Sequence, residues 1–517
     1  MHRAAKRTDT TPYWADPAPF PEFPKLKADE HADVVVIGGG IMGLTAAYLL
    51  AGAGQSVVLL ERDTCAQADT GHTSAHLTMV PDMSIAELVK GFGRDQAQAI
   101  LDGGLAAIAQ IEAIALDERI DCGFEWVPGY LHAIDRSDSA VQDAHRQADA
   151  AKGLGFDAEF VNAVPLFGTP GVRFGEQARF HPRKYLAGVA RAIGALGGRI
   201  YEHSPAEEFV ESPLGVKSNG RTVSCDEIVL ATHNPLLGVS SVSSATLFQT
   251  KLALYTSYVV AGRARHGQVP DALFWDTADA YHYLRLEPHP DHDIVIYGGE
   301  DHKTGQIEDT QPCFERLEDR LRSLVPGVEL THRWSGQVIE TPDGLPYIGE
   351  TAPHQFAGTG FAGNGMTFGT LSAMMARDHV IGRKNAWAEI FDAGRTAITK
   401  GLWEYVKENT DYPYYMIRDR FAGAEGKSLR AVKEGEGKII EIDGQRAAVS
   451  RLDGRTFVRS AECTHMGCAV AWNTAERTWD CPCHGSRFRP TGEVIGGPAE
   501  APLPAIERKQ KEAKARQ

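Results

Sequence analysis

Two short segments near the C-terminus gather side chains that bind metals. One reads CTHMGC and begins at Cys463, and the other reads CPCHGS and begins at Cys481, in a chain with only eight cysteines. Together with His465 and His484, these cysteines could converge as two thiolates and two imidazoles. Such a ligand set suits zinc or iron.

The two remaining cysteines of these segments bear on the choice of metal. A zinc site built from the four ligands would leave Cys468 and Cys483 without a role. A Rieske [2Fe-2S] centre places two cysteines on one iron and two histidines on the other. We therefore interpret the segments as a Rieske centre, with structural zinc as the alternative.

Residues 428–510 resemble the Rieske domains of the cytochrome bc-complex type, in which a disulfide joins two loops over the cluster. The resemblance extends to GGPA at residues 496–499, which is similar to the loop on the other side of the cluster. It implies that Cys463, His465, Cys481 and His484 bind the cluster. A further implication is a disulfide between Cys468 and Cys483.

The same resemblance implies that Ser486 tunes the cluster by a hydrogen bond to sulfur. Respiratory members also carry a donating tyrosine, where this chain has Phe488. The reduction potential depends on such hydrogen bonds. With one donor missing, we expect a potential below the top of the Rieske range, roughly +300 mV.

A second chemical signal lies near the N-terminus. Residues 32–61 read as an apolar strand, a glycine-rich turn, a small-residue helix and a second apolar strand. Gly38, Gly40 and Gly43 satisfy G-x-G-x-x-G, in which the turn, the approach to pyrophosphate and the helix packing each exclude a side chain. Glu61 ends the second strand, where it can bind ribose hydroxyls. This unit predicts a site for FAD or NAD.

A series of motifs over residues 32–390 resembles the D-amino acid oxidase superfamily of FAD oxidoreductases, the glycine oxidase type. The motifs are TGHTS at residues 70–74, DEIVLATHNP, the strand pair YHYLRLEP and IVIYGGED, RWSGQVIETPDGLPYIGE, and FAGTGFAGNGMTFGTLSAMMA. The resemblance implies FAD as the cofactor. Some relatives attach FAD through a histidine near His72 or His76, although a hydrogen-bonding loop histidine is the simpler interpretation.

The expected FAD contacts lie in the glycine turn, the strand end, the TGHTS loop and the last motif. They are Gly38, Gly40, Ile41, Met42, Gly43, Glu61, Arg62, Thr70, Gly71, His72, Thr73, Ser74, Ala231, Thr232, Gly363, Asn364, Gly365 and Met366.

The substrate side departs from the family pattern. Amino acid oxidases of this group often hold the substrate carboxylate with an arginine two residues beyond the glycine of W-x-G. Here Gly336 is followed by Gln337 and Val338. The missing arginine makes the chain more similar to γ-glutamylputrescine oxidase, which oxidises a primary amine. Arg285, Tyr283 and Gln337 are the candidate substrate contacts, with a structural ion pair as the alternative for Arg285.

The expected fold is an α/β Rossmann-like FAD-binding domain with an interleaved α+β substrate domain of D-amino acid oxidase type, followed by an all-β Rieske domain. The boundaries place an N-terminal arm at 1–30, the oxidoreductase at 31–425 with FAD-binding segments at 31–90, 180–240 and 330–390, the Rieske domain at 428–510, and a charged tail at 511–517.

Composition limits the partners. The formal charge of −15 argues against nucleic acid and anionic membranes, which require a basic surface. The sequence shows neither an export signal nor an apolar run of the roughly 18 residues that a membrane span needs. We therefore expect a cytoplasmic protein with a small-molecule substrate.

We expect the chain to oxidise a C–N bond of an amine or amino acid by hydride transfer to FAD. Electrons would then pass singly to the Rieske [2Fe-2S] cluster and to an external acceptor such as a ferredoxin, a cytochrome or a quinone. Two alternatives stay open: electrons could enter at the cluster so that the flavin reduces a substrate, or the protein could be a redox sensor. A Rieske oxygenase would need a separate iron on two histidines and a carboxylate, for which the sequence shows no convincing triad.

Overall fold

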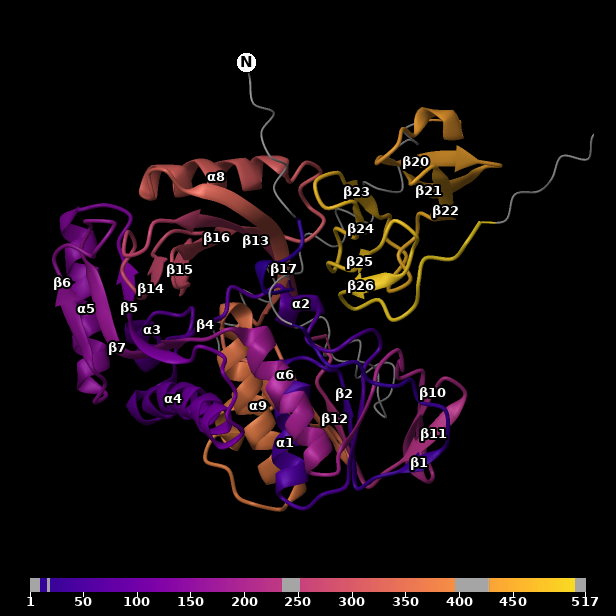
Figure 1. The fold of residues 1–517 in the computed structure, drawn as a ribbon, viewed down its shortest axis with the longest axis horizontal. Helices are drawn as coiled ribbons and strands as arrows, with labels where there is room; N and C mark the ends of the chain where they lie inside the picture. The colour runs from indigo at the N-terminus through magenta and orange to yellow at the C-terminus, as the bar shows by residue number, and fades with distance from the viewer. Residues whose placement is uncertain (1–9, 16–18, 235–251, 396–425, 427, 507–517) are drawn as a thin grey trace, which may run out of the picture. The chain divides into compact units, whose positions relative to one another are not determined.

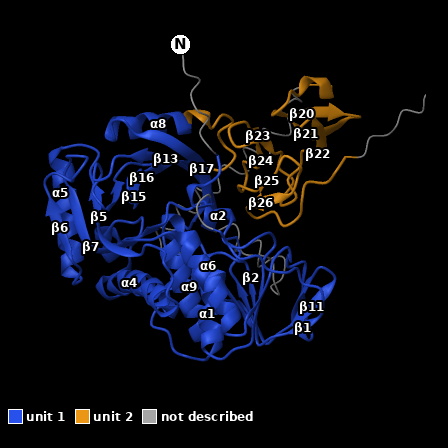
Figure 2. Cartoon of the chain, in the orientation of Figure 1, with its two compact units in different colours: residues 1–302, 313–405 blue, residues 303–312, 406–517 orange. Residues whose placement is uncertain are grey.

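The computed structural model describes residues 10–15, 19–234, 252–395, 426 and 428–506. The chain forms two compact units (Figure 2). Unit 1 comprises Met1–His302 and Cys313–Tyr405, and unit 2 comprises Lys303–Pro312 and Val406–Gln517. The predicted charged tail lies outside the described residues.

The centre of unit 1 is a six-stranded sheet in the order β18-β19-β12-β2-β3-β8. Its strands are β2 (Val34–Ile37), β3 (Val57–Leu60), β8 (Arg199–Tyr201), β12 (Glu227–Leu230), β18 (Tyr347–Ala352) and β19 (Gln355–Thr359). β8, β3, β2, β12 and β19 run parallel, and β18 is antiparallel to β19. β2 and β3 are buried along their whole length, which explains their uninterrupted runs of valine, isoleucine and leucine.

The side chains of β2 alternate between two cores. Val34 and Val36 pack in the core that contains the helices, whereas Val35 and Ile37 pack in a second core. The helices are α1 (Ile41–Gly52), α6 (Pro182–Ala195) and α9 (Gly365–Val380), with α1 packed against both others (Figure 1). A small sheet of β1 (Glu30–His31), β9 (Glu208–Glu211), β10 (Leu214–Ser218) and β11 (Arg221–Ser224) covers the other face.

A second large sheet of unit 1 has the order β17-β13-β16-β15-β14-β5-β7-β4, with β6 paired to β7. Its strands are β4 (His76–Leu77), β5 (Glu125–His132), β6 (Ala158–Val161), β7 (Gly171–Arg179), β13 (Ala253–Ala264), β14 (Leu273–Asp276), β15 (Tyr283–Pro288), β16 (Asp293–Lys303) and β17 (Glu329–Glu340). Because its strands come from several stretches between those of the six-stranded sheet, the two parts are interleaved, as the sequence predicts.

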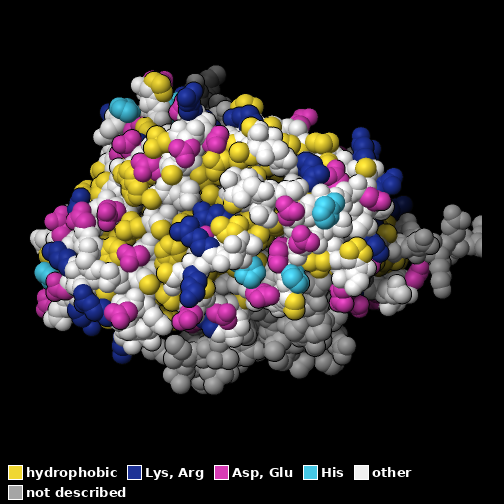
Figure 3. Space-filling view, turned by 90° about the horizontal axis from the view of Figure 1, so that it is seen from below, with side chains coloured by type: hydrophobic (Ala, Val, Ile, Leu, Met, Phe, Trp, Pro, Cys, Tyr) yellow, Lys and Arg dark blue, Asp and Glu magenta, His cyan; other side chains and the backbone are white. Residues whose placement is uncertain are grey.

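Further helices complete unit 1. They are α2 (Ala68–Gly71), α3 (Ile85–Phe92), α4 (Arg94–Asp117), α5 (Asp138–Gly153), α8 (Gln311–Leu324) and α10 (Ala388–Phe391). α4 is long and apolar enough to cross a membrane, but half of its most apolar window is buried, as in a core helix. Acidic and basic side chains are interspersed on the face drawn in Figure 3.

The described part of the N-terminal arm is anchored to unit 1 by aromatic residues. The short 3-10 helix Tyr13–Ala15 buries Tyr13 and Trp14. The Trp14 indole N–H donates to the carbonyl of Thr73 at 2.7 Å, within the predicted flavin loop. The arm therefore supports the position of that loop.

Unit 2 contains two small antiparallel sheets. One consists of β20 (Gly437–Ile442), β21 (Gln445–Leu452) and β22 (Arg455–Ser460), and the other of β23 (Ala471–Asn473), β24 (Thr478–Asp480), β25 (Arg487–Phe488) and β26 (Val494–Gly496). Its one described helical turn is the 3-10 segment Leu429–Ala431. The described part of the expected Rieske domain is thus built on strands.

Unit 2 also includes a segment from the middle of the chain. Residues 303–312, which run from the last residue of β16 to the first two residues of α8, belong to it, although the expected boundaries place them in the oxidoreductase domain. The Thr310 hydroxyl donates to Oδ1 of Asn473 at 2.9 Å in a buried hydrogen bond. A Cβ on Gly305 would lie 2.7 Å from the backbone of Cys481. This segment therefore packs tightly against a loop that carries cluster-binding residues.

Replacing Thr310 by valine should destabilise unit 2, because the buried hydroxyl is lost at nearly constant volume. We expect a loss of about 1 kcal/mol in the free energy of unfolding. Denaturant unfolding followed by the visible circular dichroism of the cluster measures it. The exposed Thr456 of β22 provides the control, since Thr456→Val should leave the midpoint unchanged; equal midpoints for both variants would contradict the packing role of the segment.

Candidate flavin pocket and Rieske centre

The turn between β2 and α1 leaves no room for side chains at two glycines. Gly38 has a φ of +107°, and a Cβ there would lie 2.4 Å from the carbonyl oxygen of Ala231. A Cβ on Gly43 would lie 1.8 Å from the carbonyl oxygen of Gly38. Gly40 is the N-cap of α1 and supplies no side-chain cap. The N–H of Ile41 donates to the Thr70 hydroxyl at 3.2 Å, and the amide groups that follow it in the first turn can face an anionic ligand.

Glu61 stands at the end of β3 beside this turn. Its carboxylate accepts hydrogen bonds from the backbone N–H groups of Gly39 at 2.7 Å and Asp63 at 2.8 Å. Burial raises the pKa of Glu61. Arg62, another expected FAD contact, forms an exposed ion pair with Asp63. Glu61 is thus oriented at the turn, where its remaining lone pairs can accept from ribose hydroxyls.

A cavity of about 380 Å³ opens beside the helix ends of unit 1. Most of the predicted flavin contacts line it: Gly40, Ile41, Met42, Thr70, His72, Thr73, Ser74, Ala231, Gly363, Asn364, Gly365 and Met366. Gly38, Gly43, Glu61, Arg62, Gly71 and Thr232 are not in its wall. The first group surrounds the space for a flavin ring, and Gly38, Gly43 and Glu61 shape the adjacent turn.

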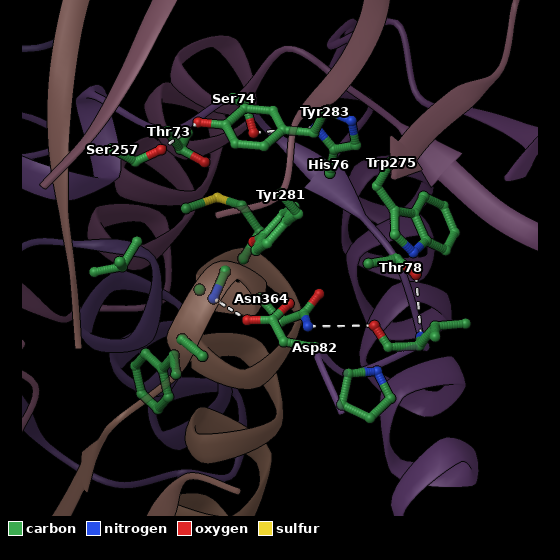
Figure 4. A pocket seen from close by; sticks show the side chains of 18 of the residues that line it. Thr73, Ser74, His76, Thr78, Asp82, Ser257, Trp275, Tyr281, Tyr283 and Asn364 are labelled. Atoms are coloured by element: carbon green, nitrogen blue, oxygen red, sulfur yellow. Dashed lines mark hydrogen bonds between the residues drawn. The ribbon is translucent and has the colours of Figure 1, made fainter. Parts of the chain in front are cut away.

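A second helix end faces this cavity. α9 begins after Asn364, whose side chain does not cap the helix but donates to the carbonyl of Val80 at 3.3 Å (Figure 4). The backbone N–H of Gly363 donates to Asp82 at 2.9 Å. The uncapped amides of α9 can stabilise negative charge on a bound ring. With its two open helix ends and glycine turn, the pocket fits FAD.

The loop histidines are held by hydrogen bonds. His72 Nδ1 lies 2.6 Å from the carbonyl oxygen of Ser335. His76 uses both ring nitrogens, Nδ1 with the Ser74 hydroxyl at 3.0 Å and Nε2 with the Leu284 carbonyl at 3.3 Å. Burial lowers the pKa of His76 to about 3, so this ring is neutral. These contacts match the hydrogen-bonding interpretation.

The wall opposite the helices comes from the second large sheet. Tyr283 and Gln337, two of the predicted substrate contacts, line the cavity. The Tyr283 hydroxyl lies 2.8 Å from that of Ser257, and its ring centroid lies 5.9 Å from that of Tyr281 (Figure 4). Burial raises the pKa of both tyrosines, so their hydroxyls remain protonated donors.

Arg285 is not a substrate contact in the structure. Its side chain is completely buried away from the cavity wall and pairs with Glu287 at 2.6 Å. It also donates to the carbonyls of Ala75 and Phe180, at 2.7 and 3.1 Å. Arg285 shares the Tyr283 face of β15 but lies two residues further along the strand, outside the cavity wall, where a buried cation needs these partners. The substrate contact was therefore wrong, and the alternative of a structural ion pair is confirmed.

Sequence reasoning missed two acidic residues of the wall, Asp82 and Asp301. Asp82 follows the short strand β4, and Asp301 lies near the end of β16. A polar residue at the end of an apolar strand, as in IVIYGGED, was a signal that could have directed attention to Asp301. Nothing in the local sequence distinguishes Asp82, because only the fold brings it to Gly363.

In unit 2, two loops bring the predicted cluster residues together. The structure joins Cys468 to Cys483 by a disulfide with a Cα–Cα distance of 6.5 Å. The sulfur of Cys481 lies within 4.8 Å of both disulfide sulfurs. The backbone N–H of Cys463 donates to the carbonyl of Cys468 at 2.8 Å, which closes the first loop.

The two histidines of these loops are suited to bind iron. The ring centroids of His465 and His484 lie 4.9 Å apart with planes at 86°. Burial lowers the pKa of His465 and lowers that of His484 to about 4. Both imidazoles are therefore neutral and can offer a nitrogen lone pair, while Cys463 and Cys481 are free thiols. This donor set fits a [2Fe-2S] cluster with thiolates on one iron and imidazoles on the other.

Ser486 is placed to tune such a cluster. It is completely buried, and its hydroxyl oxygen accepts from the backbone N–H of Ala499 at 3.1 Å. Hydrogen bonds from the Cys481 thiol and the Ser486 hydroxyl lower the pKa of Cys463 to about 7. Phe488 is buried as well and offers no donor.

Comparison with known proteins agrees with both sites. The family model described as FAD dependent oxidoreductase matches residues 33–379, and the model of the Rieske [2Fe-2S] domain matches residues 426–507. The chain belongs to the FAD dependent oxidoreductase family. It carries a C-terminal Rieske domain, and the predicted cofactors FAD and [2Fe-2S] follow from the two matches.

Three relatives illustrate how far this similarity extends. The chain is 31% identical to the Rieske 2Fe-2S iron-sulfur protein YhfW of Bacillus subtilis (strain 168), over 98% of this chain and 99% of that protein. It is 23% identical to gamma-glutamylputrescine oxidoreductase of Escherichia coli (strain K12) over 75% of this chain and 94% of that one. Glycine oxidase from Geobacillus kaustophilus shares the fold, with a TM-score of 0.61 and 18% identity over 71% of this chain and all of that structure.

The glycine turn permits a matched pair of substitutions in α1. Gly43→Ala should reduce FAD affinity about tenfold or more, because the added Cβ would displace the turn at an overpacking cost of about 1–3 kcal/mol. FAD per chain after dialysis measures it. Gly52, at the end of the same helix, has open space around its Cα, so Gly52→Ala should retain the cofactor; full FAD content in both variants would refute the role of the turn.

Two substitutions near the cluster test what sets its reduction potential. Ser486→Ala should lower the midpoint potential because a donor to sulfur is lost, and Phe488→Tyr should raise it by adding one. A redox titration followed by EPR gives both values. Ser428, which caps a 3-10 turn in unit 2, is the control, since Ser428→Ala should leave the potential unchanged. A potential that does not change with Ser486 would show that this hydroxyl does not tune the cluster.

Proposed function

We propose that the chain is a dehydrogenase that oxidises a C–N bond of an amine or amino acid and releases electrons singly through its Rieske centre to an external acceptor. The observation that carries this proposal is the cavity, in which the flavin-binding helix ends face a wall with Tyr281, Tyr283 and Gln337. FAD accepts a hydride and a [2Fe-2S] cluster changes by one electron, so their combination in one chain suits conversion from two-electron to one-electron transfer.

The residues of the wall would bind and orient the substrate. The hydroxyl of Tyr281 hydrogen-bonds to Asp82 and that of Tyr283 to Ser257, so both rings are held in the wall with hydroxyl lone pairs that can accept from a substrate. The neutral ring of His76 lies edge-on to Tyr283 with centroids 5.5 Å apart, which fixes the orientation of that tyrosine. A C–H bond next to nitrogen held against this wall would face the helix ends of the flavin site.

Relatives support a C–N bond as the target. The sequence relative from Escherichia coli is named for gamma-glutamylputrescine, an amine, and the structural relative from Geobacillus kaustophilus for glycine, an amino acid. Free thiols and neutral histidines at the cluster site support a redox-active centre in this chain. A location in the cytoplasm is part of the same proposal.

Anaerobic mixing of the purified holoenzyme with a panel of amines and amino acids tests the proposal. We expect flavin bleaching followed by the EPR signal of a reduced Rieske cluster. His465→Ala should retain flavin bleaching but reduce an added one-electron acceptor at least tenfold more slowly, because a cluster ligand is lost. No bleaching by any compound, with a cluster that only an external donor reduces, would contradict the proposal and favour inward electron flow or sensing.

A further inference from the structure

One oxygen atom in the cavity wall lacks a partner. Oδ1 of Asp301 is buried and accepts no hydrogen bond from any described residue. Asp301 lies near the end of β16 and lines the cavity. A buried carboxylate oxygen without a donor is energetically unfavourable, and a donor group of a bound ligand would remove this cost.

The other four carboxylates of the described wall are already bonded within the chain. Asp69 accepts from the N–H of Gln337 at 2.9 Å, Asp82 from that of Gly363 at 2.9 Å, Asp276 from that of His282 at 3.0 Å, and Glu87 from the Ser84 hydroxyl at 3.0 Å. Asp301 thus differs from them in having a buried oxygen to which no described residue donates.

The charge of the wall favours a cation. The described residues that line the cavity include five carboxylates but neither lysine nor arginine. A substrate carboxylate would enter without a basic partner, at a high desolvation cost. An ammonium group would meet the opposite charge in a site that excludes much of the water.

The neighbours of Asp301 complement such a group. The Ser257 hydroxyl hydrogen-bonds to the Asp301 carboxylate and lies 2.8 Å from that of Tyr283. A primary ammonium has three N–H donors, which match the free carboxylate oxygen and the lone pairs of nearby hydroxyls. The tilted rings of Tyr281 and Tyr283 offer faces to an alkyl chain or to the cation itself.

We propose that Asp301 binds the ammonium group of a primary amine that has no carboxylate on the carbon bearing nitrogen. The oxidation of that amine rests on the proposed function, whereas its binding does not. Asp301 is then the specificity-determining residue of the cavity. The absence of an arginine two residues beyond Gly336 agrees with this proposal, because a substrate without a carboxylate needs no arginine to bind it.

Binding should depend on pH. Burial raises the pKa of Asp301 to about 7, so the carboxylate is charged above this pH and neutral below it. Cation binding should therefore weaken as the pH falls through about 7. The charged and titratable groups that act on Asp301 are Asp82, His282, Glu300 and the two cavity tyrosines. The variant below separates their titration from that of Asp301.

The test uses the oxidised holoenzyme and tert-butylammonium, which has no hydrogen on the carbon bearing nitrogen and cannot be oxidised there. We expect a saturable change in flavin absorbance with tert-butylammonium and none with acetate at equal ionic strength. Asp301→Asn should weaken binding about 100-fold or more, as removal of one partner of a buried charge pair does, and should abolish the pH transition. Glu329→Gln removes an exposed carboxylate from β17 of the same sheet and should change the affinity less than about twofold.

The outcomes separate the two proposals. If tert-butylammonium binds through Asp301 but no amine bleaches the flavin, the amine site stands and the proposed oxidation fails. If amines bleach the flavin and Asp301→Asn binds and reacts as the wild type does, the anchor is overturned while the oxidation stands. Preferential binding of acetate also overturns the anchor. Should Asp301→Asn fail to retain FAD, the wild-type pH dependence and the comparison with acetate decide.

Discussion

The close backbone contact between the ends of β2 and β12 is the constraint on which the flavin pocket depends. Gly38 turns the chain against the carbonyl of Ala231, and Gly43 lets α1 pack on that turn. Because no side chain fits between them, the helix begins uncapped at the carboxyl edge of the parallel sheet. Glu61 reaches the same edge from β3 and holds the turn through Gly39. The cavity, the flavin loop and the end of α9 are arranged around this contact.

The second large sheet determines which stretch of each strand meets that cavity. On β15, Tyr283 lines the cavity, whereas Arg285, on the same face two residues later, occupies a buried site beside Glu287 and Trp14. Arg285 makes its hydrogen bonds inside the fold, and the described wall contains carboxylates and histidines but neither lysine nor arginine. The polarity of the wall thus depends on how far the cavity extends along each strand as well as on composition.

The cluster loops of unit 2 are held in place by other interactions than the glycine turn of the flavin pocket. These loops are short and consist largely of turns, so they are held by a disulfide, by backbone hydrogen bonds and by the buried Ser486. Residues 303–312 add a further support at Cys481 and Asn473. Since this segment directly follows β16, the strand that carries Asp301 continues into the unit that binds the cluster.

The sequence by itself determined the chemistry that depends on local spacing. The G-x-G-x-x-G turn, the two cysteine and histidine loops and the alternation of strands and helices could be read directly, because each involves residues close in the chain. The interleaved fold followed from motif order. Tertiary structure alone decided the burial of Arg285 outside the cavity, the place of Asp82 beside Gly363, the unpartnered oxygen of Asp301 and the packing of residues 303–312 in unit 2. These features depend on contacts between segments that are distant in the chain, and such contacts are not encoded in a short stretch of sequence.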